Sequence, residues 1–244
     1  MSEWLYGRNP IYEALRAGRR QLHGLKIARG VQQKGRVAEI LRLCQQLKVP
    51  VKQVQRQELD RIDRNHQGAA LQVGEYPYAG LDEMLVQAET AGEPPFILIL
   101  DTLQDPQNLG TLLRTAEAVG VHGVLIPLAR TATITPAVVS SSSGASEHLL
   151  VGQTNLAQAI NILKEEDIWV VGLDGGLEAQ PASQVNLGGG LALVVGSEGL
   201  GMRRLVREQC DILMRLPMVG KIESLNAAVA GSVALYLALA AREG

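Results

Sequence analysis

Four runs of apolar residues constrain the fold of this chain most. They suit strands that are covered on both faces of a parallel sheet, and they lie at 96–100, 123–127, 169–173 and 191–195. Segments with helical spacing alternate with these runs, as at Leu113, Ala116 and Val119. Alternating strands and helices predict an α/β domain with a mostly parallel sheet. In such a sheet, ligands bind beyond the carboxyl ends of the strands.

The first 75 residues predict a smaller, separate α/β/α unit. Asn9 and Pro10 are typical of a helix start, with Asn9 as the N-cap and the helix running to about residue 17. Residues 76–94 are rich in proline and glycine around one short expected helix, as in a linker. We therefore predict domains at 1–75 and 95–244, joined by the linker 76–94. Within residues 1–75 we also expect strands at 22–28, 50–54 and 69–73 and helices at 35–47 and 57–63.

The net charge of −2 conceals an uneven distribution. Residues 1–75 hold 14 Lys and Arg against 7 Asp and Glu, whereas residues 76–244 hold 9 against 18. A basic segment joined to an acidic one suggests that the first part holds a polyanion such as RNA. The alternative is an ordinary solvated basic surface.

Several classes of protein lose support from the sequence. No run reaches the ~18 apolar residues that span a membrane, and the first residues lack the apolar core of a signal peptide. Cys44 and Cys210 lie in apolar contexts, which favours buried free thiols over a disulfide. The four histidines are scattered, so no metal site is expected. These features together favour a cytoplasmic protein.

Polar residues gather just before the expected last helix, at Lys221, Glu223, Ser224 and Asn226. Ser224 is the expected N-cap. Polar groups at a helix N-terminus suggest an anion or ligand site, and a simple capped amphipathic helix is the alternative. The segment 216–226 is also one of three loops that follow strands, with 105–110 and 196–201. The glycine-rich loop 196–201 has neither the dinucleotide fingerprint nor the P-loop lysine, so NAD and ATP lose support.

Three motifs in these loops resemble those of the SpoU/TrmH family, S-adenosylmethionine-dependent RNA ribose 2′-O-methyltransferases of the SPOUT superfamily. They are LDxLxDPxNLGxLLRTA at 100–116, VVGSEGLGM at 194–202 and LPMxGxxxSLNxxVA at 216–230, in the family's order. The N-terminal GRNPxxEAL at 7–15 and HQG at 66–68 resemble the substrate-binding domain of the subgroup that methylates a guanosine of 23S rRNA. The resemblance spans nearly the whole chain.

The resemblance implies a fold and partners that periodicity does not show. It implies a deep trefoil knot in the C-terminal domain and an N-terminal domain like the ribosomal protein L30e, which binds the substrate, 23S rRNA or its precursor. It also implies a homodimer with active sites near the subunit interface, and S-adenosyl-L-methionine as cofactor. The cofactor contacts carried over onto this chain are Gly196, Leu216, Leu225, Leu193 and Met218.

The resemblance also implies a catalytic set, formed by Arg114, Asn108, Glu198, Ser224 and Asn226. Arg114 follows Asn108 by six residues, so one helix can present it near the site. The family proposal makes this arginine the general base. A guanidinium is always charged in proteins, so electrostatic stabilisation of the forming alkoxide is the alternative. For Glu198, a structural role in holding the loops together is the alternative.

Candidate RNA contacts are spread over both parts of the chain: Arg8, Asn9, His66, Gln67, Arg204 and Lys221. Turn and capping chemistry, or a solvated surface, is the alternative for each. A tRNA ribose remains an alternative substrate, although the N-terminal module argues against it. A binding-only ribosome-assembly protein is another alternative, and the intact set of catalytic residues argues against that.

Overall fold

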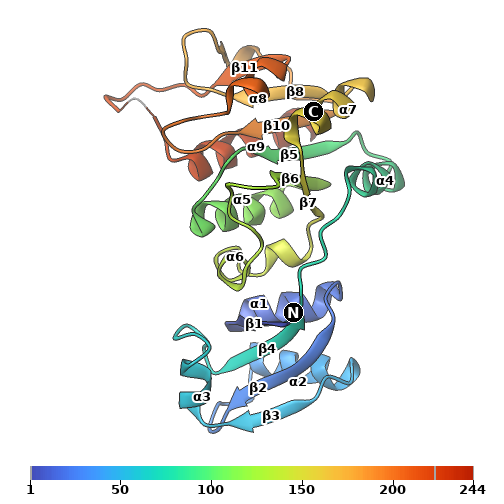
Figure 1. Cartoon of the computed structure of the whole chain (residues 1–244), viewed down its shortest axis with the longest axis vertical. Coiled ribbons are helices and arrows are strands. Elements are labelled where there is room, and N and C mark those ends of the chain that lie inside the picture. The colour runs from blue at the N-terminus through green and yellow to red at the C-terminus, as the bar shows by residue number, and fades with distance from the viewer. Residues whose placement is uncertain (1, 223, 244) are drawn as a thin grey trace. The chain divides into compact units, whose positions relative to one another are not determined.

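The computed structural model describes residues 2–222 and 224–243, which form two compact units. One unit combines Met1–Pro77 with Thr133–His148, and the other combines Tyr78–Ala132 with Leu149–Gly244. Figure 1 shows the elements of each unit along the chain. Glu223, one of the polar residues expected before the last helix, lies outside the described residues.

Four strands of the described chain form the sheet of the first unit, in the order β1-β4-β2-β3. The β1–β4 and β4–β2 pairs are antiparallel and the β2–β3 pair is parallel. The elements are β1 (Ser2–Tyr6), α1 (Arg8–Ala17), β2 (Leu22–Ala28), α2 (Arg36–Gln46), β3 (Val51–Val54), α3 (Arg56–Asp60) and β4 (Ala69–Gly74). Strand β1 was not predicted, because it is short and only Leu5 among its residues is buried.

The expected start of α1 is wrong by two residues. Gly7, with φ of 86°, is the residue before the helix, and Asn9 lies inside its first turn. Pro10 still fits, because the N–H groups of a first helical turn have no intrahelical acceptor to lose.

A short segment from the second half of the chain completes the first unit. It contains α6 (Pro136–Ser141) and the 3-10 turn η1 (Ala145–Glu147), and both contact α1. The Arg20 guanidinium binds the Glu147 carboxylate at 2.9 Å, and Glu147 is only 1% exposed. Burial raises the pKa of the Glu147 carboxyl, while the charge of Arg20 acts in the opposite direction. The Tyr76 hydroxyl donates to the Ser146 carbonyl at 2.9 Å.

Seven strands of the described chain form the sheet of the second unit, in the order β7-β6-β5-β10-β8-β11-β9. All its strand pairs are parallel, which confirms the predicted parallel α/β fold. The four apolar runs are its strands β5 (Phe96–Leu100), β6 (Gly123–Pro127), β8 (Trp169–Leu173) and β10 (Leu191–Val195). The other strands are β7 (Val151–Thr154), β9 (Gln180–Pro181) and β11 (Ile212–Arg215).

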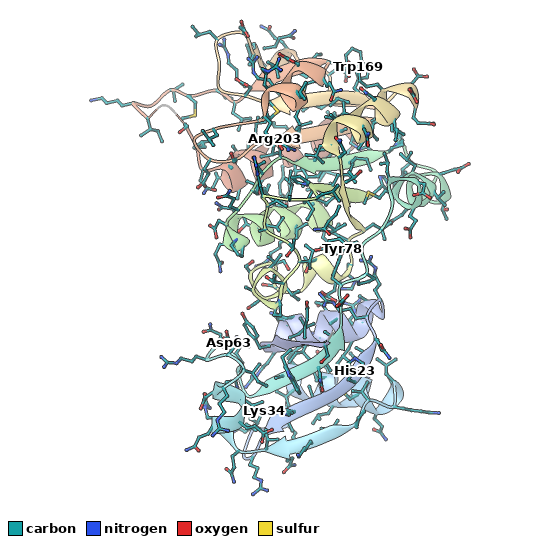
Figure 2. The ribbon with its side chains drawn as sticks, viewed as in Figure 1. His23, Lys34, Asp63, Tyr78, Trp169 and Arg203 are labelled. Atoms are coloured by element: carbon teal, nitrogen blue, oxygen red, sulfur yellow. The ribbon has the colours of Figure 1, made fainter. Side chains whose placement is uncertain are left out.

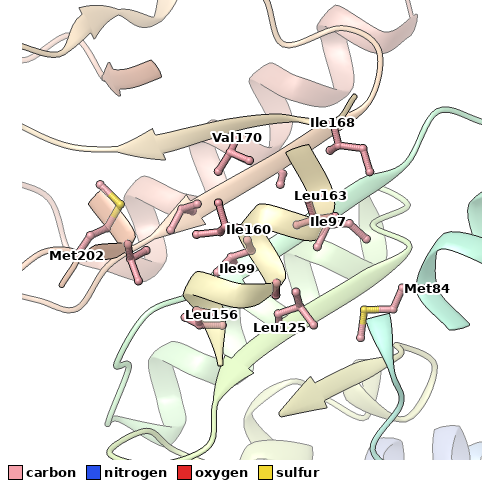
Figure 3. Packing of buried hydrophobic residues seen from close by; sticks show 14 residues of the cluster. Met84, Ile97, Ile99, Leu125, Leu156, Ile160, Leu163, Ile168, Val170 and Met202 are labelled. Atoms are coloured by element: carbon pink, nitrogen blue, oxygen red, sulfur yellow. The ribbon is translucent and has the colours of Figure 1, made fainter. Parts of the chain in front are cut away.

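Helices cover both faces of this sheet. Figure 3 shows one face, where Ile97, Ile99 and Val170 pack against Ile160 and Leu163 of α7 (Leu156–Glu165). Met84 of α4 (Leu81–Ala91) and Val206 of α8 (Arg204–Gln209) extend this core. On the other face lie α5 (Pro106–Ala118) and α9 (Ala227–Glu243), which contact each other. The chain is close-packed there, since a Cβ on Gly231 would lie 2.6 Å from the Leu112 side chain.

The N-cap of α9 is Asn226, so the expected cap at Ser224 is wrong. The Asn226 side-chain oxygen accepts from the backbone N–H groups of Ala228 at 2.9 Å and Val229 at 3.1 Å. Asn155 caps α7 in the same way. Over residues 2–222 and 224–243, no helix is both long and apolar enough to cross a membrane.

Candidate functional site

A pocket of about 490 Å³ opens at the carboxyl edge of the second unit's sheet. The segments around it follow β8, β10 and β11, and they belong to the edge where the sequence predicted a ligand site. Its lining residues are Leu173, Asp174, Gly175, Val195, Gly196, Ser197, Glu198, Gly199, Gly201, Leu216, Met218, Ser224, Leu225, Asn226, Ala227 and Ala230.

Gly196 lets the backbone of the loop after β10 fold tightly on itself. A Cβ at Gly196 would lie 2.2 Å from the Gly201 carbonyl carbon and 2.3 Å from the Met202 nitrogen. Ser197 and Gly201 exchange two backbone hydrogen bonds of 3.0 Å, which close a small loop around residues 198–200. Backbone groups of this loop can therefore approach a ligand without interference from side chains at its base.

Three polar side chains from three different segments meet beside this loop. One Glu198 oxygen accepts from the Asn108 amide at 3.0 Å and from the Asn226 amide. The Asn226 amide also donates to the Asn108 oxygen at 3.2 Å. The three residues form one network that ties α5, the loop after β10 and the start of α9 together.

The predicted catalytic residues fall into two groups. Asn108, Glu198 and Asn226 meet in the network, and Ser224 lines the same pocket. Arg114 is an exposed residue of α5 and is absent from the described lining of the pocket. Six residues at about 100° each place Arg114 about 240° around the helix from Asn108. Arg114 is therefore not among the described lining of either pocket in this single chain, and its catalytic role stays a prediction.

Most of the predicted cofactor contacts line the first pocket. Gly196, Leu216, Leu225 and Met218 all line the pocket. Leu193 is the exception, because it is fully buried within β10 between its neighbours on β5 and β8. Its side chain is core packing and has no surface to offer a ligand.

A second pocket, of about 460 Å³, adjoins the first and shares Ser197, Glu198 and Gly201 with it. Its remaining lining comes from α5, from the loops after β5, β6 and β10, and from the residue before α8: Thr102, Leu103, Gln104, Asp105, Asn108, Arg130, Leu200, Met202 and Arg203. Figure 2 labels Arg203. Sequence reasoning missed Gln104 and Arg130, although both follow buried strands and so lie at the edge where ligands bind.

The predicted RNA contacts of the first unit include both exposed residues and one that is buried. The Arg8 side chain donates to the Gln67 carbonyl at 3.2 Å, and the Gln67 side chain accepts from the Arg8 backbone at 3.1 Å. Asn9 is exposed beside them. His66 is fully buried, accepts from the Gly68 N–H at 2.8 Å and lies 3.1 Å from Asp60. The prediction that His66 touches RNA is wrong, because its ring holds the turn together.

A basic pocket of about 300 Å³ lies next to Arg8 in the first unit. Arg29, Lys34 and Arg56 also line it, with Ala28, Gly30, Val31 and Gln32. No carboxylate of residues 2–222 or 224–243 forms an ion pair with any of these four cations, whereas Arg20 and Arg36 are paired. Sequence reasoning found the excess positive charge of this unit but not the residues that concentrate it.

Arg204 and Lys221, the predicted RNA contacts of the second unit, are exposed. Arg204 pairs with Glu208 along α8 at 2.9 Å. Neither residue is among the described lining of the two adjoining pockets. Within the part of the chain that the structure describes, no three His, Cys, Asp or Glu side chains are grouped as a metal site requires.

Sequence comparison decides which family has this arrangement. A model described as the SpoU rRNA methylase family matches residues 95–236. The chain belongs to this family. A second model, described as RNA 2′-O ribose methyltransferase substrate binding, matches residues 4–79. The SpoU/TrmH resemblance is thereby confirmed, and the chain is an RNA methyltransferase of this family.

Relatives and solved structures agree over nearly the full length. A Bacillus subtilis protein, named as a TrmH family tRNA/rRNA methyltransferase, is 43% identical over 96% of this chain and 94% of its own. The SpoU methyltransferase AviRb of Streptomyces viridochromogenes, solved with AdoMet, has a TM-score of 0.81 at 23% identity, covering 98% of this chain and 90% of that one. An AdoMet-bound rRNA methyltransferase of Sinorhizobium meliloti gives 0.80 at 22% identity, covering 97% and 86%.

AviRb and the Sinorhizobium meliloti enzyme were both solved with AdoMet bound, and this is the cofactor that the SpoU/TrmH resemblance predicts for the chain. The first pocket fits such a molecule on its own chemistry. Its volume of about 490 Å³ lies within the range of small-molecule sites. Gly196 places loop backbone rather than a side chain in the pocket wall, and Leu216, Met218 and Leu225 give apolar surfaces for the faces of an adenine.

Proposed function

We propose that this SpoU methyltransferase transfers a methyl group to the 2′-oxygen of a ribose in RNA, and that the target is a guanosine of 23S rRNA or its precursor. The Asn108–Glu198–Asn226 network carries this proposal. It joins residues from all three motifs at the wall between two adjoining pockets. One pocket suits the methyl donor, and the wall is where donor and acceptor meet.

The cofactor supplies a methyl group that is already activated on a sulfonium. The chain must therefore chiefly align the accepting oxygen, and alignment alone can contribute about 7–11 kcal/mol. Gly196, Leu216 and Leu225 hold the cofactor, while Glu198 fixes the two asparagine amides that orient the ribose. Ser224, in the same lining, offers a further hydroxyl to the ribose.

As the new O–CH3 bond forms and the S–CH3 bond breaks, S-adenosylhomocysteine is released and the proton of the 2′-hydroxyl passes to solvent. Arg114 can stabilise the negative charge that develops on the oxygen, because its guanidinium stays charged. Arg114 is absent from the described lining of both pockets of its own chain, so we place its action at a partner's site in a homodimer.

The surface of α9 supports this homodimer. Val229, Val233, Tyr236 and Leu237 are all between 40% and 56% exposed on that helix. Exposed apolar surface of this kind, continuous along one helix, is typical of a protein–protein interface. Helix α5, which bears Arg114, contacts α9, and Thr115 lies 2.9 Å from Ser232. A dimer formed through these helices brings Arg114 close to the second subunit.

RNA binding by the first unit is supported by its basic pocket. Arg8, Arg29, Lys34 and Arg56 can neutralise backbone phosphates, which supply most of the affinity in non-specific nucleic-acid binding. The proposal includes an L30e-like fold for this unit and a trefoil knot around residues 196–226. Residues from both the 196–201 loop and the segment after β11 line one pocket, which supports the knot. A cytoplasmic location follows from an RNA substrate.

Methyl transfer from labelled S-adenosylmethionine to 23S rRNA fragments and to tRNA tests the proposal. Mass spectrometry of the digested product should place the methyl on a guanosine ribose of the rRNA. A methyl on a base would overturn the reaction, and a methyl on tRNA alone would overturn the substrate. A protein that binds RNA but not S-adenosylmethionine would instead be a binding-only member. Asn108→Ala serves as the site variant, and Glu208→Ala on the exposed face of α8 is its matched control.

A further inference from the structure

The outer part of the pocket beside the cofactor site holds residues to which the proposed methyl transfer assigns no role. It shares the Glu198 wall with the first pocket, but its outer lining is different. Gln104, Arg130 and Leu200 are exposed there, and Leu200 is 91% exposed although it is apolar. The amide can hydrogen-bond to the polar edge of a base, the guanidinium can bind a phosphate, and the aliphatic side chain can pack against a flat ring. These three groups together suit a nucleotide.

The loops that carry these side chains are fixed by hydrogen bonds. The Leu103 carbonyl accepts from the Ala132 N–H at 2.7 Å and from the Thr131 hydroxyl at 2.8 Å. Thr102 and Arg130 each have φ of 61°. Residues other than glycine rarely adopt this conformation, and it persists where the surrounding structure enforces it. The two loops therefore present Arg130 and Gln104 from a defined backbone.

The arginines of this pocket can bind an anion, because the carboxylates in its lining are bonded to other groups. Arg130 has no carboxylate partner among residues 2–222 and 224–243. Arg203 uses its Nε on Asp101 at 2.7 Å, and its side chain is 50% exposed. The two carboxylates in the lining are already bonded, since Asp105 caps α5 by accepting from Gln107 at 2.9 Å and Glu198 accepts the asparagine amides.

We propose that this pocket holds the methyl-accepting nucleotide of the RNA, unstacked from its neighbours. Leu200 lies against the face of the base, Gln104 binds the base edge and Arg130 binds the adjoining phosphate. Enzymes that work on one nucleotide commonly take it out of the stack and bind its edge in a pocket. The volume of about 460 Å³ is within the range of small-molecule sites. The inference rests on the proposed methyl transfer, because only then does the acceptor lie across the Glu198 wall.

Nucleotide binding tests the pocket without turnover. The full-length protein is saturated with S-adenosylhomocysteine, so that the cofactor pocket is filled, and titrated with each of the four ribonucleoside 5′-monophosphates by ligand-observed NMR. We expect one base to bind best, and Arg130→Ala to weaken that binding by about 10- to 100-fold, as for loss of a charged hydrogen bond. Arg130→Lys should retain part of the affinity. Gln104→Ala should reduce the difference between the best and the worst base.

The matched control is Lys164→Ala, which removes a positive charge at the end of α7, before β8 begins at the opposite edge of the sheet. It should leave nucleotide binding unchanged, and all these variants should bind S-adenosylmethionine as the unsubstituted protein does. Nucleotide affinity that survives in both Arg130→Ala and Gln104→Ala, or no nucleotide binding at all, would overturn the inference. Failure of the unsubstituted protein to bind S-adenosylmethionine would instead overturn the proposed function.

Discussion

Asp101 and Arg203 fasten the loop after β5 to the start of α8. The Asp101 carboxylate, which is fully buried, accepts from the Arg203 backbone N–H at 2.7 Å and from its Nε at 2.7 Å. The Asp101 N–H in turn donates to the Val195 carbonyl at 2.8 Å. These bonds hold the two ends of the loop that contains Glu198, so the position of the polar network depends on them.

Asp101→Ala should lower the free energy of unfolding by about 1–3 kcal/mol, because it removes both charge-assisted hydrogen bonds that the carboxylate accepts from Arg203. Denaturant unfolding measures this effect. Arg203→Ala keeps the backbone bond but leaves the fully buried Asp101 carboxylate without its cation, so its loss should be at least as large. A clearly smaller loss in Arg203→Ala would contradict the role given to this ion pair.

Gly196→Ala should abolish tight binding of S-adenosylmethionine. The new Cβ would lie 2.2 Å from a backbone carbon of Gly201, so the loop would have to open. Overpacking of this kind typically costs about 1–3 kcal/mol. Gly220→Ala is the matched control, because a Cβ there meets nothing within 4 Å. Isothermal titration with the cofactor compares the two, and unchanged binding in Gly196→Ala would refute the close approach.

Glu198→Ala should reduce methyl transfer by about 100-fold or more, because it releases the amides of Asn108 and Asn226 together. Glu198→Gln keeps one oxygen that can accept both bonds, so it should retain more activity than Glu198→Ala. Single-turnover rates with saturating RNA measure the difference. If both variants transferred methyl at the unsubstituted rate, the network would have only a structural role.

Combined replacement of Arg29, Lys34 and Arg56 by alanine should weaken RNA binding and reduce its salt dependence. Log affinity falls with log salt concentration, and each lost phosphate contact with single-stranded RNA makes this negative slope shallower by about 0.7. Arg42→Ala with Lys48→Ala, at the carboxyl end of α2 and just beyond it, removes charge away from the basic pocket. That control should change the slope little. Titrations at several salt concentrations distinguish the two sets.

Both cysteines should resist modification in the folded protein. Burial raises the pKa of the Cys44 thiol to about 11, and burial together with the nearby Asp211 charge raises that of Cys210 to about 12. Because these thiols have a higher pKa in the folded than in the unfolded protein, their contribution to the free energy of unfolding is fully present at pH values below the unfolded pKa. This contribution is lost as the pH rises through the pKa values of the folded protein. A thiol reagent at pH 8 should therefore react rapidly only after denaturation. Rapid reaction of the native protein would contradict the burial of these thiols.

Local patterns allowed much of the second unit to be predicted. A strand buried on both faces must be apolar throughout, so β5, β6, β8 and β10 were visible as runs of residues. The loops that follow such strands share an edge, which is why the positions of Asn108, Glu198 and Asn226 could be anticipated. Short edge strands such as β7 and β9 carry too few residues to leave such a pattern.

The sequence by itself determined the parallel α/β sheet, the family motifs and the uneven distribution of charge. Only the tertiary structure decided that Glu147 belongs with Arg20, 127 residues away, that His66 is buried, and that Arg114 is an exposed residue outside the described lining of the pocket. The physical reason is that sequence periodicity indicates only on which side of its own helix or strand a residue lies. Burial of a polar side chain, and the direction it takes from a helix, depend on partners that the fold brings from distant segments.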